Sequence, residues 1–214
     1  MFQVFHVARL FAKHGLIVHA NEMPAPKEKK APRLLAAHYG GQDVTFLGRL
    51  IFPHVENLVV DARTFPIRDP WPVNPKSLSL VYTFGDSPTD EKWVFVSKAG
   101  EDTVWTLTSD DIKTQPPGVT LASAWPPEVP GRIKIYAVIY GLEQITHPTV
   151  YRRLYEAASR NERIYISNKF FSNSPLINED PWRGTIKSAA IVYTIRGKWK
   201  SISGREREYM SWEL

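Results

Sequence analysis

Two short loops in this chain combine an acid, a proline and an indole, a set of side chains that can bind a sugar ring. They are Asp69-Pro70-Trp71 and Asp180-Pro181-Trp182. An indole offers a flat apolar face, and a neighbouring carboxylate accepts hydrogen bonds from hydroxyl groups. The aspartate and the tryptophan of each loop are therefore candidate ligand-binding residues.

Two tyrosines, each followed by a glycine, could supply a second surface for such a ligand. They are Tyr39 and Tyr140, and Asp43 adds a further carboxylate near the first of them. A structural interpretation of the loops is also open and is the stronger one for the loops taken alone. The acid can accept backbone N–H groups in a turn, the proline can direct the chain into a strand, and the indole can fill the end of a core.

Other chemistry finds no support in the sequence. The six histidines lack metal-ligand spacing, and we find no nucleophile elbow, phosphate loop or dinucleotide fingerprint. We therefore assign no catalytic residue, metal or cofactor. The expected activity is binding, while an enzyme with an unrecognised site remains an alternative.

These loops lie within an internal repeat. Asp69-Pro70-Trp71, Lys76-Ser77 and Val81-Tyr82-Thr83 recur 111 residues later as Asp180-Pro181-Trp182, Lys187-Ser188 and Val192-Tyr193-Thr194. Allowing small insertions, the match extends in both directions, and Lys92-Trp93 aligns with Lys198-Trp199. The spacing predicts a tandem duplication with two small modules rather than a solenoid, which needs more and shorter repeats.

The repeat divides the chain into four segments. We expect an N-terminal helix with a Pro/Lys linker (1–34), a first β module (35–107), a Pro-rich connector (108–135) and a second β module (136–214).

Each module is rich in short strand patterns. In the 76–84 segment Leu78, Leu80 and Tyr82 alternate with smaller or polar residues, and Ala189, Ile191 and Tyr193 repeat this parity. Further β-branched or aromatic runs cover 57–62, 93–97, 103–107, 132–140, 164–167 and 209–214. The predicted fold is all-β, in two β-sandwich-like modules with one or two short helices.

One helix is predicted in the second module. Thr146 can cap it, Pro148 suits its first turn, and Val150, Leu154, Ala157 and Ala158 recur at helical spacing. The corresponding 46–51 segment of the first module is shorter and contains Gly48.

Composition restricts the location of the protein. The 214 residues contain no cysteine, which excludes disulfides and favours a reducing compartment such as the cytoplasm. No apolar run is long enough to span a membrane. The acid-free start, residues 1–21, would also suit a mitochondrial transit peptide, although its few Arg and Ser favour a packed helix.

The distribution of charge and the composition of the connector indicate which kinds of partner the protein could bind. The first module has a net charge of −3 and the second +4, but the basic residues are scattered among acids and aromatics. This argues against a nucleic-acid footprint, which needs a concentrated basic stripe. Trp125 in the connector is a candidate partner-binding residue, because an indole is unusual in a Pro-rich linker.

The order of motifs also resembles a known family. Tyr39-Gly40, Asp43-Val44-Thr45, Asp69-Pro70-Trp71-Pro72 and the 76–82 segment resemble a domain of unknown function. That domain occurs at the C-terminus of certain mitochondrial DnaJ-like proteins and in free-standing fungal and bacterial proteins. The second copy departs from the pattern at Gln144, where the family has aspartate. The resemblance implies a β-rich accessory module and brings no known activity.

Together these patterns predict a non-enzymatic protein that binds a carbohydrate, lectin-like, through its Asp-Pro-Trp loops. A module that binds a partner protein is the alternative.

Overall fold

The chain is mainly β, as predicted. The computed structural model describes residues 33–51, 57–59, 67, 69, 71–72, 74–84, 87, 92–99, 104–106, 133–171 and 180–214. These ranges also hold three short helices, α2 (Thr45–Ile51), α3 (Pro148–Ser159) and α4 (Asn168–Phe171). The expected N-terminal helix and the connector with Trp125 lie outside the described residues.

The first half of the chain, residues 33–106, forms a four-stranded antiparallel sheet and a two-stranded ribbon. The strand order in the sheet is β2-β1-β4-β5, and β3 pairs with β6 in the ribbon. The strands are β1 (Arg33–Tyr39), β2 (Gln42–Asp43), β3 (Asn57–Val59), β4 (Lys76–Thr83), β5 (Lys92–Ala99) and β6 (Val104–Thr106).

The second half, residues 133–214, repeats this order of strands, with α4 between β9 and β10. Its sheet has the order β8-β7-β10-β11, and β9 pairs with β12. The strands are β7 (Ile133–Tyr140), β8 (Glu143–Gln144), β9 (Ile164–Tyr165), β10 (Ser188–Ile195), β11 (Lys198–Arg205) and β12 (Tyr209–Met210). Both halves begin two or three residues earlier than the predicted modules.

An irregularity in the strand pairing recurs at the same place in both sheets. The register of β1 on β4 shifts between Leu34 and Ala36, and that of β7 on β10 shifts at Tyr136. Leu35 and Tyr136, the extra residues, hold corresponding positions in their halves. Because a bulge bends and twists its strand, both sheets receive the same local distortion.

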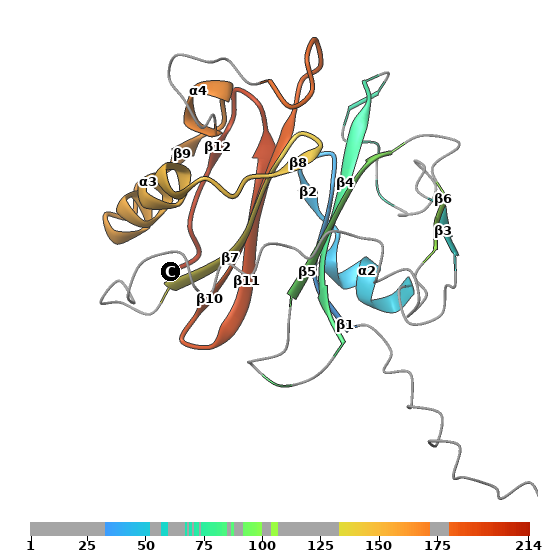
Figure 1. Ribbon diagram of the computed structural model, residues 1–214, viewed down its shortest axis with the longest axis horizontal. Coiled ribbons are helices and arrows are strands. Elements are labelled where there is room, and N and C mark those ends of the chain that lie inside the picture. Colours follow the sequence, from blue (N-terminus) through green and yellow to red (C-terminus); the bar gives the residue numbers. More distant parts are fainter. Residues whose placement is uncertain are drawn as a thin grey trace, which may run out of the picture.

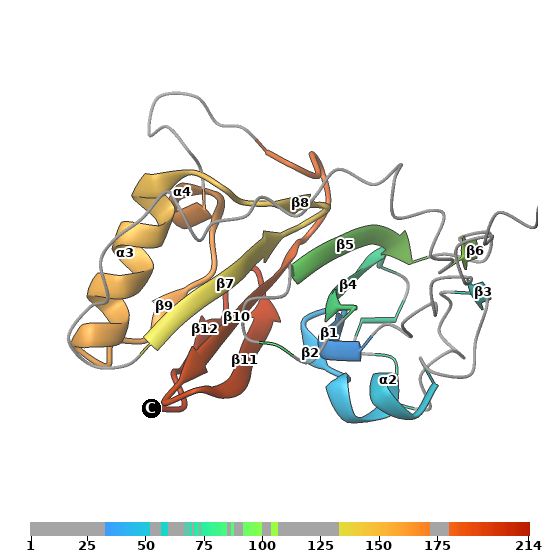
Figure 2. The same ribbon diagram turned by 60° about the horizontal axis from the view of Figure 1, so that its bottom comes forward.

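The two sheets pack face to face, one from each half, and we call the layer between them the seam. Figures 1 and 2 show the sheets opposed, with α2 outside one and α3 and α4 outside the other. Aliphatic side chains fill the seam, namely Leu35, Ala36, Val81, Ala137, Ile139, Ala190 and Val192. The sheet-on-sheet packing is thus between the halves. The outer face of the first sheet is covered by α2, and that of the second by α3, α4 and the β9–β12 ribbon.

The outer faces follow the predicted alternation. Leu78, Leu80 and Tyr82 of β4 lie in the core beneath α2. Ala189, Ile191 and Tyr193 of β10 lie in the larger core beneath α3 and α4. The residues grouped by the period-two pattern therefore share one face of each central strand, and this face is the one that helices cover.

The register corrects one detail of the repeat alignment. Trp93 pairs with Tyr82 and packs in the outer core, whereas Trp199 pairs with Thr194 and packs in the seam. The two tryptophans hence lie on opposite faces, and the match of Trp93 to Trp199 was one residue out of register. Pairing instead matches Trp199 to Lys92.

The predicted helix of the second half is present, with a different cap. His147 rather than Thr146 is the N-cap residue, and its Nδ1 accepts the N–H of Thr149 at 3.2 Å. Val150, Leu154, Ala157 and Ala158 are buried, as their spacing predicts. None of the helices in the described ranges has the length and apolarity needed to cross a membrane.

The halves approach each other closely at the centre and at one end of the seam. Ser77 and Ser188, at corresponding positions, form a buried hydrogen bond of 2.7 Å between their hydroxyls. At one end of the seam, Gly41 faces the backbone of Gly204, so that a Cβ on Gly41 would lie 2.7 Å from the Gly204 carbonyl oxygen. The Ser203 hydroxyl donates to the Gly41 carbonyl at 3.0 Å beside this contact.

We expect Gly41→Ala to lower the free energy of unfolding by about 1–3 kcal/mol. Gly41 has a φ of +79°, which strains any L side chain, and the added methyl would also push on the facing backbone. Gly184→Ala is the matched control, because Gly184 has a φ of +77° with nothing near its added Cβ. Equal losses in urea denaturation would mean that the close approach contributes nothing.

Candidate functional site

The Asp-Pro-Trp loops fold alike in the two halves. Asp69 Oδ1 accepts the N–H of Trp71 at 2.8 Å, and Asp180 Oδ1 accepts the N–H of Trp182 at 2.9 Å. Each carboxylate also pairs with the lysine seven residues later, Lys76 at 2.9 Å and Lys187 at 3.0 Å. The repeated Asp and Lys thus form one ion pair that closes each loop.

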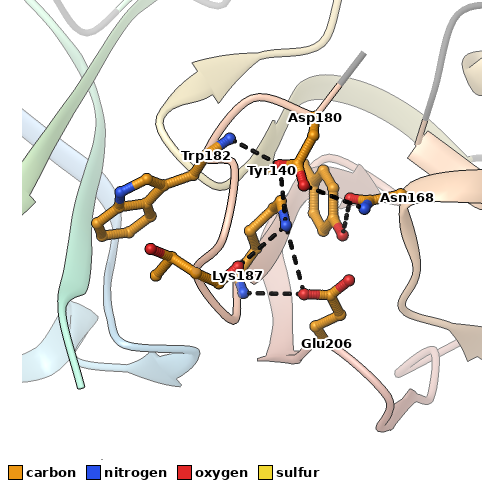
Figure 3. A network of polar contacts seen from close by, with 7 residues as sticks. Tyr140, Asn168, Asp180, Trp182, Lys187 and Glu206 are labelled. Atoms are coloured by element: carbon orange, nitrogen blue, oxygen red, sulfur yellow. Dashed lines mark hydrogen bonds and ion pairs between the residues drawn. The ribbon is translucent and has the colours of Figure 1, made fainter. Parts of the chain in front are cut away.

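The second-half pair belongs to a larger polar cluster (Figure 3). Lys187 Nζ lies 3.5 Å from Glu206 Oε2 and 3.0 Å from the carbonyl oxygen of Thr185, in addition to Asp180. Three acceptors match the three N–H groups of an ammonium. The Lys187 side chain is only 2% exposed, so this fully bonded ammonium is a structural element rather than a free nucleophile or base.

Burial and hydrogen bonding set the pKa values in this cluster. The pKa of Tyr140 is raised, first by burial and then by the negative charges of Glu206 and Asp180. Burial alone would raise the pKa of Asp180, but hydrogen bonds from Lys187 and Trp182 outweigh it and keep that pKa below its usual value. Tyr140 donates to Asn168 at 2.8 Å and stacks on Phe171.

The candidate aromatic residues are less accessible than a binding surface requires. Tyr39, Tyr140 and Trp71 are 3%, 1% and 4% exposed, and Trp182 is half-buried. Arg205 of the second half lies over the Trp71 ring, 5.8 Å from its centre. Figure 3 shows the indole of Trp182 directed away from the Lys187 cluster. The Trp71 face is therefore occupied by the protein itself.

Asp43 differs from the other candidates because it lines a pocket. The pocket has a volume of about 160 Å³ and opens where the halves meet at one end of the seam. The first half lines it with Leu35, Asp43, Thr45 and Arg49, and the second half with Trp199, Lys200, Ser201 and Glu213. We call it the seam pocket.

The polar side chains of the seam pocket bond across the halves and within them. Asp43 Oδ2 accepts the Ser201 hydroxyl at 2.6 Å, and its Oδ1 accepts the Thr45 N–H at 2.8 Å. Partial burial tends to raise the pKa of Asp43, but these hydrogen bonds hold it below its usual value. Lys200 pairs with Glu213 at 2.7 Å, which raises the pKa of Lys200.

The corresponding end of the seam lacks these groups. Strand pairing matches Asp43 to Gln144 and Ser201 to Val94, so an amide and an apolar side chain hold the positions of the two hydrogen-bonded groups. Within the described residues, the amide nitrogen of Gln144 is buried without a partner. The two halves therefore differ at both members of this contact.

Most of the seam pocket was not predicted from the sequence. Asp43 was identified, but Arg49, Trp199, Lys200, Ser201 and Glu213 were not, because they come from both halves. The one available signal was the departure from the repeat at Gln144. Trp125, the candidate partner-binding residue, lies outside the described residues. No group of His, Asp and Glu in the described ranges could hold a metal ion.

Comparisons of the chain with protein-family models, with curated proteins and with solved structures find no match.

Proposed function

We propose that this protein is a non-enzymatic binding protein that takes a small carbohydrate in the seam pocket. The observation that carries the proposal is that pocket itself, which combines one indole with hydrogen-bond donors and acceptors from both halves. Its volume of about 160 Å³ suits a ligand the size of one sugar ring. Drug-sized ligands need clefts of about 300–1,000 Å³.

The side chains of the pocket match the chemistry of a sugar. Each sugar hydroxyl can both donate and accept, and the pocket offers the carboxylates of Asp43 and Glu213 beside the cations Arg49 and Lys200. Trp199 also lines the pocket, and its indole can face the apolar side of a sugar ring. The charges of the lining balance, which suits a ligand rich in hydroxyls.

Binding without catalysis is supported by the state of the two carboxylates. The lowered pKa of Asp43 keeps it ionised near neutral pH, where it could not act as a general acid. Glu213 is held by Lys200 in an exposed ion pair. Asp43 is therefore not prepared to donate a proton.

The same proposal places the Asp-Pro-Trp loops in the architecture. Their aspartates are bound by Lys76 and Lys187, and the Trp71 face is covered by Arg205. We further propose that the halves descend from a tandem duplication, supported by the shared element order, sheet order and bulge position.

Binding of a partner protein is the second candidate, favoured by one surface feature. Tyr165 and Tyr209 lie side by side on the outer face of the β9–β12 ribbon, with ring centres 5.0 Å apart and exposures of 43% and 59%. Arg163 lies over the Tyr209 ring at 4.9 Å. Tyrosine and arginine are enriched at protein interfaces.

The carbohydrate proposal is tested by glycan-array screening of the full chain, followed by titration with the best ligand. We expect Trp199→Ala to weaken binding at least about tenfold through loss of the aromatic wall. Glu213→Gln, at an exposed position, should weaken it without affecting folding. Trp182→Ala is the matched control and should bind normally.

Three outcomes would count against this proposal. Loss of binding in Trp182→Ala but not in Trp199→Ala would return the site to the Asp-Pro-Trp loops. Absence of any glycan binding by the unaltered chain would eliminate the carbohydrate. A partner protein whose binding is lost in Tyr209→Ala, with no glycan bound, would favour the second candidate.

A further inference from the structure

Arg49 of the seam pocket is held in a way that leaves most of its guanidinium available. It follows Thr45 by one helical turn on α2, so both side chains reach the same pocket. Its Nε donates to the Leu34 carbonyl at 3.2 Å, and its Nη2 donates to the Leu35 carbonyl at 3.0 Å. A guanidinium carries five N–H donors, so three have no acceptor among the described residues.

The other charged side chains of the pocket already have partners. Lys200 is paired with Glu213, and Asp43 accepts from Ser201 and Thr45. Arg49, by contrast, is fixed by neutral carbonyls, and no described acid forms an ion pair with it. The charge of Arg49 is thus the least compensated in the lining.

A fixed guanidinium with spare donors is a typical carboxylate site. Its planar fork can make two parallel hydrogen bonds to a carboxylate, which a lysine cannot do. A phosphate group fits the same fork but carries a charge of about −1.5 to −2 at neutral pH. The carboxylates of Asp43 and Glu213 line the same pocket and would repel a doubly charged group more than a singly charged one.

We infer that the carbohydrate bound by the seam pocket is an acidic monosaccharide of the hexuronate class, with its carboxylate on Arg49. Its hydroxyls would then meet Asp43 and Ser201, and its ring would lie against Trp199. This inference rests on the proposed function and adds the chemical class of the sugar and the residue that selects it.

The test compares four probes on the full chain by calorimetric titration: glucuronate, glucose, glucose 6-phosphate and acetate. We expect glucuronate to bind at least about tenfold more tightly than glucose, the usual effect of a charge-assisted hydrogen bond. Glucose 6-phosphate and acetate should bind more weakly than glucuronate. The preference for glucuronate over glucose should shrink as salt is added, because Arg49 is exposed.

Three variants then assign the preference to Arg49. Arg49→Gln should bring glucuronate binding down to that of glucose, and Arg49→Lys should keep part of the preference, because it retains the charge without the fork. Arg153→Gln is the matched control, because Arg153 also donates to two backbone carbonyls, those of Lys169 and Phe170, outside the pocket. It should leave the preference unchanged.

The outcomes separate this inference from the proposed function. Equal binding of glucose and glucuronate would overturn the inference while the carbohydrate site stands. Acetate binding as tightly as glucuronate, or tighter binding of glucose 6-phosphate, would also overturn it. Failure of every sugar to bind would overturn both.

Discussion

Lys187→Met is expected to lower the free energy of unfolding by about 3–5 kcal/mol, the usual cost of removing one partner of a buried ion pair. The side chains of Asp180 and Glu206 are only 18% and 17% exposed, and they would lose the ammonium between them. The Thr185 carbonyl would lose its Lys187 donor as well. Urea denaturation of the full chain at neutral pH measures the loss.

Lys76→Met is the matched control in the first half, with an expected loss of about 1–2 kcal/mol. Among the described residues Lys76 pairs with one carboxylate, Asp69, which is 34% exposed, and the position that corresponds to Glu206 is Ala99. Adding Asp180→Asn to Lys187→Met should recover part of the larger loss. Equal losses for the two lysines would show that the second carboxylate of the cluster contributes nothing.

Acidification from pH 7 to about pH 4 is expected to destabilise the protein through His38. Alternation along β1 places His38 in the seam with Ala36, where neither ring nitrogen has a hydrogen-bond partner among the described residues. Burial lowers the pKa of His38 from 6.5 to about 4, although the Asp43 charge opposes this. Each pKa unit corresponds to ~1.4 kcal/mol, so His38 accounts for about 3 kcal/mol.

The direction in which stability changes with pH follows from proton binding. Between about pH 6.5 and pH 4 the unfolded chain binds the His38 proton and the folded chain does not, so stability falls as pH falls through that range. The pKa values of Asp43, Asp69 and Asp180 are lowered, so the stability that these carboxylates contribute is lost only under more acidic conditions. Denaturation curves at half-unit pH steps would separate the two ranges.

His38→Ile is the variant that isolates this effect. Isoleucine occupies the corresponding position 139 in the other half, where it is buried in the seam. The variant should be more stable than the unaltered chain at pH 5, and its stability should change little down to about pH 4. A stability of the unaltered chain that stays constant over this range would show that His38 can ionise inside the fold.

The central strands were predictable because their sequence patterns are local. Alternation in β4 and β10, the turn residues after them and the helical spacing of α3 all depend on neighbours along the chain. β1 was missed because Leu34, Leu35, Ala36 and Ala37 are apolar on both faces, in agreement with its place between a helix and a second sheet. β11 was missed because its serines and lysines leave too few apolar residues for a recognisable alternating pattern.

The seam could not be predicted, because its contacts join residues far apart in the sequence. The repeat indicated two similar units but carried no information on whether they lie side by side or pack face to face. Trp71 illustrates the difficulty: its motif left open whether the indole is exposed or buried, and the Arg205 that covers it comes from the other half. The seam pocket escaped prediction for the same reason, since Asp43 gains Ser201 as a partner only in the folded chain.

The unequal ends of the seam have a consequence for how such a site can evolve. In a symmetric homodimer each substitution occurs twice, so the two ends of an isologous interface must stay identical. Here a single chain carries both halves, and Asp43 with Ser201 at one end coexists with Gln144 and Val94 at the other. One end can therefore acquire specificity while the other keeps the apolar packing that holds the fold, a division of labour that a homodimer of one half could not achieve.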